Sequence, residues 1–280
     1  MATEAEYASA IFLKAALPLL RVLAEENASV RKAFARKNGT VQVSAAPAPG
    51  ERELPAAVGA DGGSGGEPAK VGTHFVVTDG ILSCSTKLAD APDIELEFPS
   101  LAALNAFFSG KSMKLPRIKG AFKAPGLLIA TFKGLLSMSA ALGAKDPPKT
   151  EEARSLLVKL YFYLLSSGIS ALNKAGHPAV RKWALASPDR VYAFAVDGRP
   201  DLGAYIRVKA GNTRAARGVY GRSRPFFTMS FDSVESALGI LLEKDDMIGA
   251  TVAERIVMLG APEYGAMLGD FMMIVGNYAK

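Results

Sequence analysis

The order of apolar and polar positions is similar in the two halves of the chain. Helical periodicity, strand-like alternation, a short helix, a strand and an apolar helix follow one another in each half. In the first half these segments are residues 4–36 (interrupted at Pro18), 40–45, 73–78, 81–88, 94–98, 99–108, 117–123 and 125–142. In the second half they are residues 151–186, 191–196, 203–209, 214–220, 226–231, 232–242, 254–259 and 262–278. Helices segregated from runs of strands predict an α+β fold, with helices covering a mainly antiparallel sheet in each unit.

Short stretches of sequence also recur between the halves, in the same order. The matched pairs are Phe12–Lys14 with Leu157–Lys159, Val30–Lys32 with Val180–Lys182, Phe98–Leu104 with Phe231–Leu238, and Ala124–Pro125 with Ala261–Pro262. Arg117–Ile118 and Arg255–Ile256 precede the last of these pairs. An ordered repeat of this length predicts a duplicated unit. We expect one unit over residues 1–146, with a glycine-rich flexible insertion at 47–70, and a second over residues 147–280.

The second half resembles a known family. Phe227–Val234 leads from a strand into a helix, and after a charged turn Ile256–Tyr264 opens the final apolar helix. This passage resembles the sterol carrier protein 2 family of lipid-transfer domains, well over residues 189–280 and less well over 75–142. In the first half Gly126 stands where the resembling pattern has an acidic residue. The resemblance implies a non-enzymatic carrier that holds a hydrophobic ligand in an apolar pocket.

Both apolar helices carry hydrophobic side chains on more than one face. Such a helix should be buried on both sides, by the sheet on one and by a ligand, a partner or another helix on the other. The flexible methionines suit varied hydrocarbon shapes, although ordinary cores also use them. The candidate ligand-binding residues are Phe227, Leu241, Tyr264, Met267, Leu268, Phe271 and Met272, with Leu128, Phe132 and Leu135 in the first half.

One stretch of the second half is rich in basic residues. The net charge is +6, which is too diffuse to indicate nucleic-acid binding. No acidic residue occurs between Asp201 and Asp232, where the basic residues include Arg214, Arg217, Arg222 and Arg224. We expect these four side chains to share an exposed face that contacts anionic headgroups, phosphorylated ligands or an acidic partner, and that binds an anionic membrane transiently. Solvated strand and loop edges are the alternative.

Catalytic and metal-binding patterns are weak. A metal site needs clustered ligands, but the chain has one cysteine, Cys84, and two distant histidines, His74 and His177. We find no nucleophile elbow and no complete phosphate-binding loop, and strand alternation explains the Glu95 and Glu97 pair. We therefore expect no enzyme activity, no metal and no cofactor.

The N-terminus and the two longest apolar segments bear on location. Glu4 and Glu6 stand where a secretory signal would carry basic residues, and the single cysteine fits a reducing compartment, so we expect a cytoplasmic protein. Residues 155–172 and 124–144 approach the length of a membrane span, but each contains a lysine. We interpret both as buried helices.

These observations favour intracellular binding and transfer of a lipid-like molecule such as a sterol, fatty acyl chain, isoprenoid or phospholipid. A protein-interaction or scaffold module is the first alternative. An enzyme, or an accessory subunit that presents a hydrophobic substrate, is the second. The sequence leaves open the ligand, the number of pockets and the oligomeric state.

Overall fold

The computed structural model describes residues 2–46 and 70–279, which form two compact units. Unit 1 holds the described residues of 1–139, 175–177 and 278–280, and unit 2 holds residues 140–174 and 178–277. The expected insertion at 47–70 lies outside the described residues except for Lys70. The expected division at residue 146 falls in the segment between α5 and α6.

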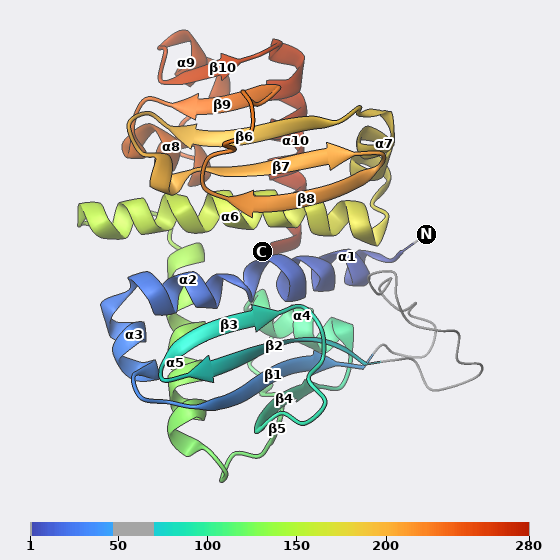
Figure 1. Cartoon of the computed structure of the whole chain (residues 1–280), viewed down its shortest axis with the longest axis vertical. Helices are drawn as coiled ribbons and strands as arrows, with labels where there is room; N and C mark the ends of the chain where they lie inside the picture. Colours follow the sequence, from blue (N-terminus) through green and yellow to red (C-terminus); the bar gives the residue numbers. More distant parts are fainter. Residues whose placement is uncertain (1, 47–69, 280) are drawn as a thin grey trace. The chain divides into compact units, whose positions relative to one another are not determined.

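Unit 1 contains a five-stranded sheet, sheet A, with the order β3-β2-β1-β4-β5 (Figure 1). Its strands are β1 (Gly39–Ala45), β2 (Val71–Thr78), β3 (Ile81–Ser85), β4 (Ile94–Phe98) and β5 (Arg117–Lys119). The pair β1 and β4 is parallel, and the other neighbouring pairs are antiparallel. The sheet is therefore mainly antiparallel, as the alternation pattern predicts.

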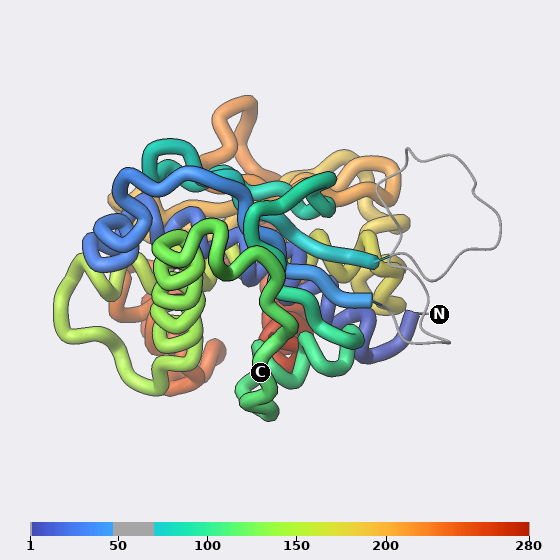
Figure 2. Tube along the Cα trace, turned by 90° about the horizontal axis from the view of Figure 1, so that it is seen from below, coloured from blue at the N-terminus to red at the C-terminus, as the bar shows by residue number. Residues whose placement is uncertain are grey.

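The helices of unit 1 cover one face of sheet A. They are α1 (Glu4–Ile11), the π-helix η1 (Phe12–Ala16), α2 (Leu19–Glu26), α3 (Ala28–Phe34), α4 (Leu101–Phe108) and α5 (Pro125–Leu142), the last of which ends in unit 2. Thr73 Oγ1 on β2 donates to the carbonyl of Leu13, and a Cβ at Gly134 on α5 would overlap Leu20 on α2. Figure 2 shows α5 as a continuous coil beside the strands. Pro18 falls between η1 and α2, as expected of a residue that lacks a backbone N–H.

Unit 2 repeats this topology in sheet B, with the strand order β10-β9-β6-β7-β8. Its strands are β6 (Arg190–Val196), β7 (Ala204–Lys209), β8 (Asn212–Arg217), β9 (Phe227–Phe231) and β10 (Ile256–Leu259). The parallel pair again includes the central strand, here β6 with β9. Its helices are α6 (Glu151–Ala175), α7 (Pro178–Ala186), the 3-10 turn η2 (Pro200–Leu202), α8 (Val234–Leu241), α9 (Met247–Val252) and α10 (Pro262–Ala279).

The core of unit 2 lies between sheet B and its helices. Phe162 on α6 stacks against Phe194 on β6 and Phe231 on β9, and all three side chains are fully buried. Alternate residues of β6 therefore point toward the helices, since side chains of a strand alternate between its faces. Tyr192, two residues from Phe194, shares that helix-covered face.

The prediction of an α+β fold made of two similar units is confirmed. Phe98 and Phe231 end equivalent strands, and Val30 and Val180 are buried at equivalent places on α3 and α7. One local expectation was wrong, because the charged turn before β10 contains the short helix α9. Ser233 caps α8, since its hydroxyl accepts a hydrogen bond from the amide of Ser236.

Three helical stretches are long and apolar enough to cross a membrane by length and composition: Glu4–Glu26, Pro125–Leu142 and Glu151–Ala175. The expectation of a buried helix holds for the third, of whose most apolar window 83% is buried. It was wrong for α5, where only 33% of the corresponding window is buried. Ile129 and Leu136 on α5 are exposed.

Candidate functional site

Unit 2 contains a cluster of five aromatic side chains on the helix-covered face of sheet B. We call it the aromatic cluster: Trp183 from α7, Tyr192 from β6, Phe226 before β9, and Tyr264 and Phe271 from α10. The Trp183 ring lies 5.2 Å from the rings of both Tyr192 and Phe271. The Tyr264 ring lies 4.9 Å from Phe226 and 6.0 Å from Tyr192. Edge-to-face contacts of this kind hold the rings in a defined arrangement.

One cation belongs to this cluster. Arg190 begins β6 two residues before Tyr192, so both point to the same face. Its Nη1 donates to the hydroxyl of Tyr264 at 2.9 Å, and its guanidinium carbon lies 3.7 Å from the centre of the Phe226 ring. Within the described residues, Arg190 makes no ion pair with a carboxylate. The site thus combines apolar walls with a half-buried positive charge.

The cluster also contains a buried donor. The indole Nε1 of Trp183 is inaccessible to solvent and has no hydrogen-bond partner among the described residues. The neighbouring hydroxyl of Tyr192 instead lies 3.4 Å from that of Ser187. A buried N–H without an acceptor costs about 1–3 kcal/mol, so an acceptor placed there would be stabilising.

The final helix α10 is buried on one face only. Leu268 and Phe271 are buried and Tyr264, Met267 and Met272 are half-buried, whereas Met273 is 68% exposed. The expectation that a ligand or a partner covers the other side of α10 stays a prediction. Of the other predicted ligand residues in this unit, Phe227 on β9 is fully buried and Leu241 on α8 is half-buried.

Two methionines fill the space left by glycines along α10. A Cβ at Gly265 would overlap the sulfur of Met258 on β10, and one at Gly269 would lie 3.5 Å from the terminal methyl of Met247 on α9. Gly265 and Gly269 are four residues apart, so they lie on one side of the helix. Methionine side chains rearrange easily, because they are unbranched and flexible. This wall of the core can therefore adapt in shape.

The predicted residues of the first unit form a different environment. Leu128 and Phe132 on α5 are half-buried, and Leu135 is buried. The strand register and helix starts match each residue of the aromatic cluster to a position in unit 1. The residues at the positions of Trp183, Arg190, Tyr192, Phe226, Tyr264 and Phe271 are, in order, Ala33, Gly39, Val41, Asp93, Leu127 and Gly134. The aromatic cluster is therefore particular to unit 2.

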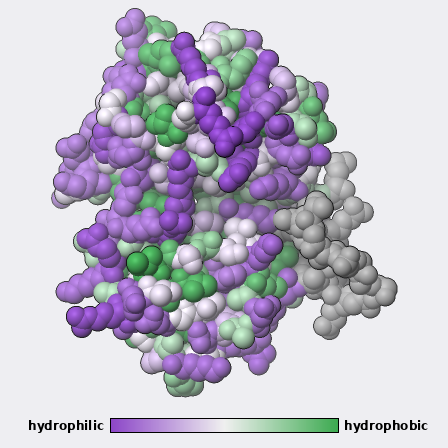
Figure 3. Space-filling view, in the orientation of Figure 1, coloured by the Kyte–Doolittle hydropathy of each residue, from purple (hydrophilic) through white to green (hydrophobic). Residues whose placement is uncertain are grey.

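The four predicted anion-contacting arginines are exposed, but they do not share one face. Arg214 lies opposite Arg207 in the register of β7 and β8. Arg217 is three residues further along the strand, and its guanidinium carbon lies 4.9 Å from the ring centre of Tyr163 on α6. The expectation of a common face was therefore wrong for Arg217, because residues three apart in a strand point to opposite faces. Arg222 and Arg224 lie in the loop before β9. Figure 3 shows hydrophilic side chains gathered over the strands of sheet B.

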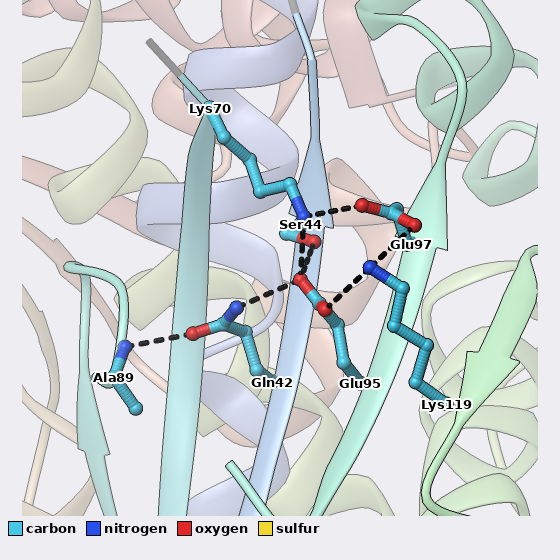
Figure 4. A network of polar contacts seen from close by, with 7 residues as sticks. All are labelled: Gln42, Ser44, Lys70, Ala89, Glu95, Glu97 and Lys119. Atoms are coloured by element: carbon cyan, nitrogen blue, oxygen red, sulfur yellow. Dashed lines mark hydrogen bonds and ion pairs between the residues drawn. The ribbon is translucent and has the colours of Figure 1, made fainter. Parts of the chain in front are cut away.

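A polar network lies on the opposite face of sheet A from the helices (Figure 4). Glu95 Oε1 accepts hydrogen bonds from Gln42, Ser44 and Lys70, at 2.9, 2.6 and 2.9 Å. Lys70 also bonds Glu97, and Lys119 pairs with both carboxylates. The Gln42 side-chain oxygen accepts from the amide of Ala89 at 2.7 Å.

The electrostatics of this network oppose a role in proton transfer. Burial raises the pKa of Glu95, but the hydrogen bonds from Ser44, Lys70 and Gln42 outweigh it and lower that pKa to about 2. Hydrogen bonds from Lys70 and Lys119 also lower the pKa of Glu97. Both carboxylates are therefore ionised at pH 7, and the ammonium groups of Lys70 and Lys119 balance their charge. The arrangement ties β1, β4, β5 and Lys70 together.

The histidines and the metal-ligating residue types are dispersed. His74 Nδ1 lies 2.8 Å from the carbonyl oxygen of Lys87. The His177 ring packs 5.0 Å from the ring of Tyr7, and burial lowers its pKa. Across residues 2–46 and 70–279, no group of three or more His, Cys, Asp or Glu side chains is placed to hold a metal ion.

Sequence reasoning missed Trp183, Arg190, Tyr192 and Phe226. The signal that was present is that Trp183 is the only tryptophan of the chain, in a helix that otherwise repeats its counterpart. The rings of the cluster come from segments up to 88 residues apart, as numbered from Trp183 to Phe271, so no local pattern connects them. Their meeting depends on tertiary packing.

Comparisons with known proteins add little. No family model matches the chain, and no curated protein matches it. Among solved structures, it is similar to the stereoselective inverting sec-alkylsulfatase Pisa1 from Pseudomonas sp., at 13% identity and a TM-score of 0.24, over 53% of this chain and 28% of that one. A double mutant of that sulfatase gives 16% identity and a TM-score of 0.25, over 52% and 28%. The chain therefore covers less than a third of these enzymes, and at such TM-scores the likeness carries no argument about fold or activity.

Proposed function

We propose that unit 2 binds a hydrophobic, lipid-like molecule between α10, α7 and the helix-covered face of sheet B, and that the protein carries this molecule without chemically changing it. The observation that carries the proposal is the aromatic cluster, a wall of large apolar rings that includes a half-buried cation. Small-molecule sites are mainly apolar, with few well-placed polar groups. The resemblance to the sterol carrier protein 2 family over residues 189–280 supports the same function.

The side chains around the site favour an adaptable pocket over a rigid one. Met247, Met258, Met267 and Met272 all lie along or against α10. A ligand enters when these flexible side chains move aside, so the packing of the free protein is compatible with binding. Burial of each methylene contributes about 0.8 kcal/mol, so a ten-carbon chain offers roughly 8 kcal/mol before the costs of ordering. Exchangeable binding follows from apolar contacts alone.

Titration with a fluorescent fatty acid, cis-parinaric acid, tests this proposal. Met267→Glu places a charge on the half-buried side of α10, and Met273→Glu places the same charge on its exposed side. We expect the first variant to lose binding, because burial of the new carboxylate beneath a hydrocarbon ligand costs free energy, and the second to bind like the wild type. Phe271→Leu, which keeps an apolar side chain, should fold and bind more weakly. Equal affinities in all four folded proteins would contradict the proposal.

A protein-interaction module is the second candidate. It is favoured by Ile129 and Leu136, each 69% exposed on α5 of unit 1. These side chains are seven residues apart and lie on the same side of the helix. A polypeptide that co-purifies in fixed stoichiometry, and is lost in Ile129→Lys with Leu136→Lys, would favour this function.

A further inference from the structure

Two polar groups of the aromatic cluster are not explained by the packing of unit 2. Arg190 carries a charge in half-buried surroundings, where it meets the side chains of Tyr192, Tyr264 and Phe226. No carboxylate of the described residues forms an ion pair with it. Trp183 directs a buried N–H at no acceptor among the described residues. Both flank Tyr192, whose ring contacts Trp183 on α7 and Tyr264 on α10. An apolar core would not need either group.

From these two groups we infer that the ligand of unit 2 is an amphiphile with an anionic oxygen head group. Arg190 binds the negative charge, and the Nε1–H of Trp183 donates to an oxygen of the head. This inference rests on the proposed function and narrows it, because it excludes purely hydrocarbon and cationic ligands as preferred occupants. Hydrogen bonds to charged groups are roughly twice as strong as neutral ones, which favours an oxyanion over a hydroxyl.

The comparison of the two units supports this assignment. The positions of Arg190 and Trp183 are held in unit 1 by Gly39 and Ala33, and that of Phe226 by Asp93. Asp93 Oδ2 accepts a hydrogen bond from the amide of Thr40 at 2.7 Å and lies 2.9 Å from where a Cβ at Gly39 would stand. Unit 1 therefore has a carboxylate beside the position that Arg190 occupies in unit 2. The same fold therefore forms without either group. Their presence in unit 2 is an addition to the fold and not a requirement of it.

Other polar groups close to the cluster have partners of their own. Arg181 on α7 donates to the carbonyl of Gly211 at 2.8 Å. Asp189 pairs with Arg207, 2.6 Å away, and so does not neutralise Arg190, its neighbour in sequence. Arg190 and Trp183 are thus the groups available to a ligand in this part of the described structure.

Four ten-carbon probes test the inference on the full-length chain by isothermal titration calorimetry. They are decanoate, decyl phosphate, decanol and decylammonium, which share a chain and differ only in the head. We expect the wild type to bind the two anions about tenfold more tightly than decanol, and decanol more tightly than decylammonium, which offers no acceptor. The emission of Trp183, the only tryptophan, should shift when decanoate binds. A preference between the anions distinguishes a fatty acid from a phosphate-bearing lipid.

Two variants separate the roles of the polar groups. Arg190→Gln should weaken the binding of the two anions about tenfold and leave the affinity for decanol unchanged. The control Arg181→Gln, with the same loss of charge, should change the affinity for none of the probes. Trp183→Phe keeps an aromatic ring but removes the N–H donor. It should therefore weaken the binding of the three probes with an oxygen in the head group and leave the affinity for decylammonium unchanged. Circular dichroism checks that each variant is folded.

These measurements distinguish a failure of the head-group assignment from a failure of the proposed function. If all four probes bind with equal affinity and the variants do not discriminate between heads, the inference is overturned while the proposed function stands. If none of the probes binds, the proposed function fails with it. Tight binding of decylammonium alone would overturn the assignment of Arg190.

Discussion

The charge on Glu95 should make unit 1 sensitive to acid. The substitution Glu95→Gln removes the charge but keeps the size of the side chain. In the folded protein the pKa of Glu95 is lowered from 4.5 to about 2, because its hydrogen bonds outweigh burial. A lowered folded-state pKa contributes stability that is present above pH 4.5 and is lost as the pH falls toward 2.

The magnitude follows from this shift. At about 1.4 kcal/mol for each pH unit, the charged form contributes roughly 3 kcal/mol to the free energy of unfolding at pH 7. At pH 3 less than half of this contribution remains, since Glu95 is then mostly protonated in the unfolded chain. The difference between the wild type and Glu95→Gln should therefore shrink from roughly 3 kcal/mol at pH 7 to about 1 kcal/mol at pH 3.

Urea unfolding followed by circular dichroism at several pH values measures this difference. Asp90→Asn, which removes an exposed carboxylate in the loop before β4, is the matched control and should stay within about 0.5 kcal/mol of the wild type at each pH. A difference between wild type and Glu95→Gln that does not vary between pH 7 and pH 3 would refute the assignment of the charge to this network.

Two further predictions concern the backbone and the arginines. Gly120 has φ +74°, and a Cβ there would overlap the carbonyl oxygen of Asp93. Gly120→Ala should therefore lower the free energy of unfolding by at least about 2 kcal/mol, which calorimetry detects as a lower Tm. An unchanged Tm would contradict the packing of the chain after β5. In co-sedimentation with phosphatidylserine vesicles, Arg222→Gln with Arg224→Gln should weaken binding by about 1 kcal/mol per cation, whereas Arg217→Gln should have a smaller effect because that side chain covers Tyr163. Equal losses from all three sites would show that Arg217 reaches the membrane.

Local pattern was sufficient for the elements that periodicity and proline define. The bounds of β4 and α5 agree with the sequence to the residue, because Pro125 starts a long apolar helix and Ile94–Phe98 alternates apolar and acidic residues. Helix α9 was not predicted, because six residues are too few to show a helical period. The orientation of Arg217 was misjudged because it requires the register of β8 to be known.

The candidate site was predictable in part. The final helix and Phe227 were found from sequence, since an apolar helix must bury at least one face. Trp183 and Arg190 were not. Trp183 is distinguished by its lack of an acceptor and Arg190 by its aromatic surroundings, and both become visible only when the neighbours from α7, β6 and α10 are in place.

The central claim is that unit 2 carries a hydrophobic ligand against α10. Native mass spectrometry of the full-length protein purified from its own cells, followed by extraction and identification of any bound molecule, tests this most directly. We predict one equivalent of an amphiphilic lipid on the wild type and on Met273→Glu, and none on Met267→Glu. A wild-type protein that carries no small molecule and acquires none when incubated with lipid extract from those cells would contradict the account.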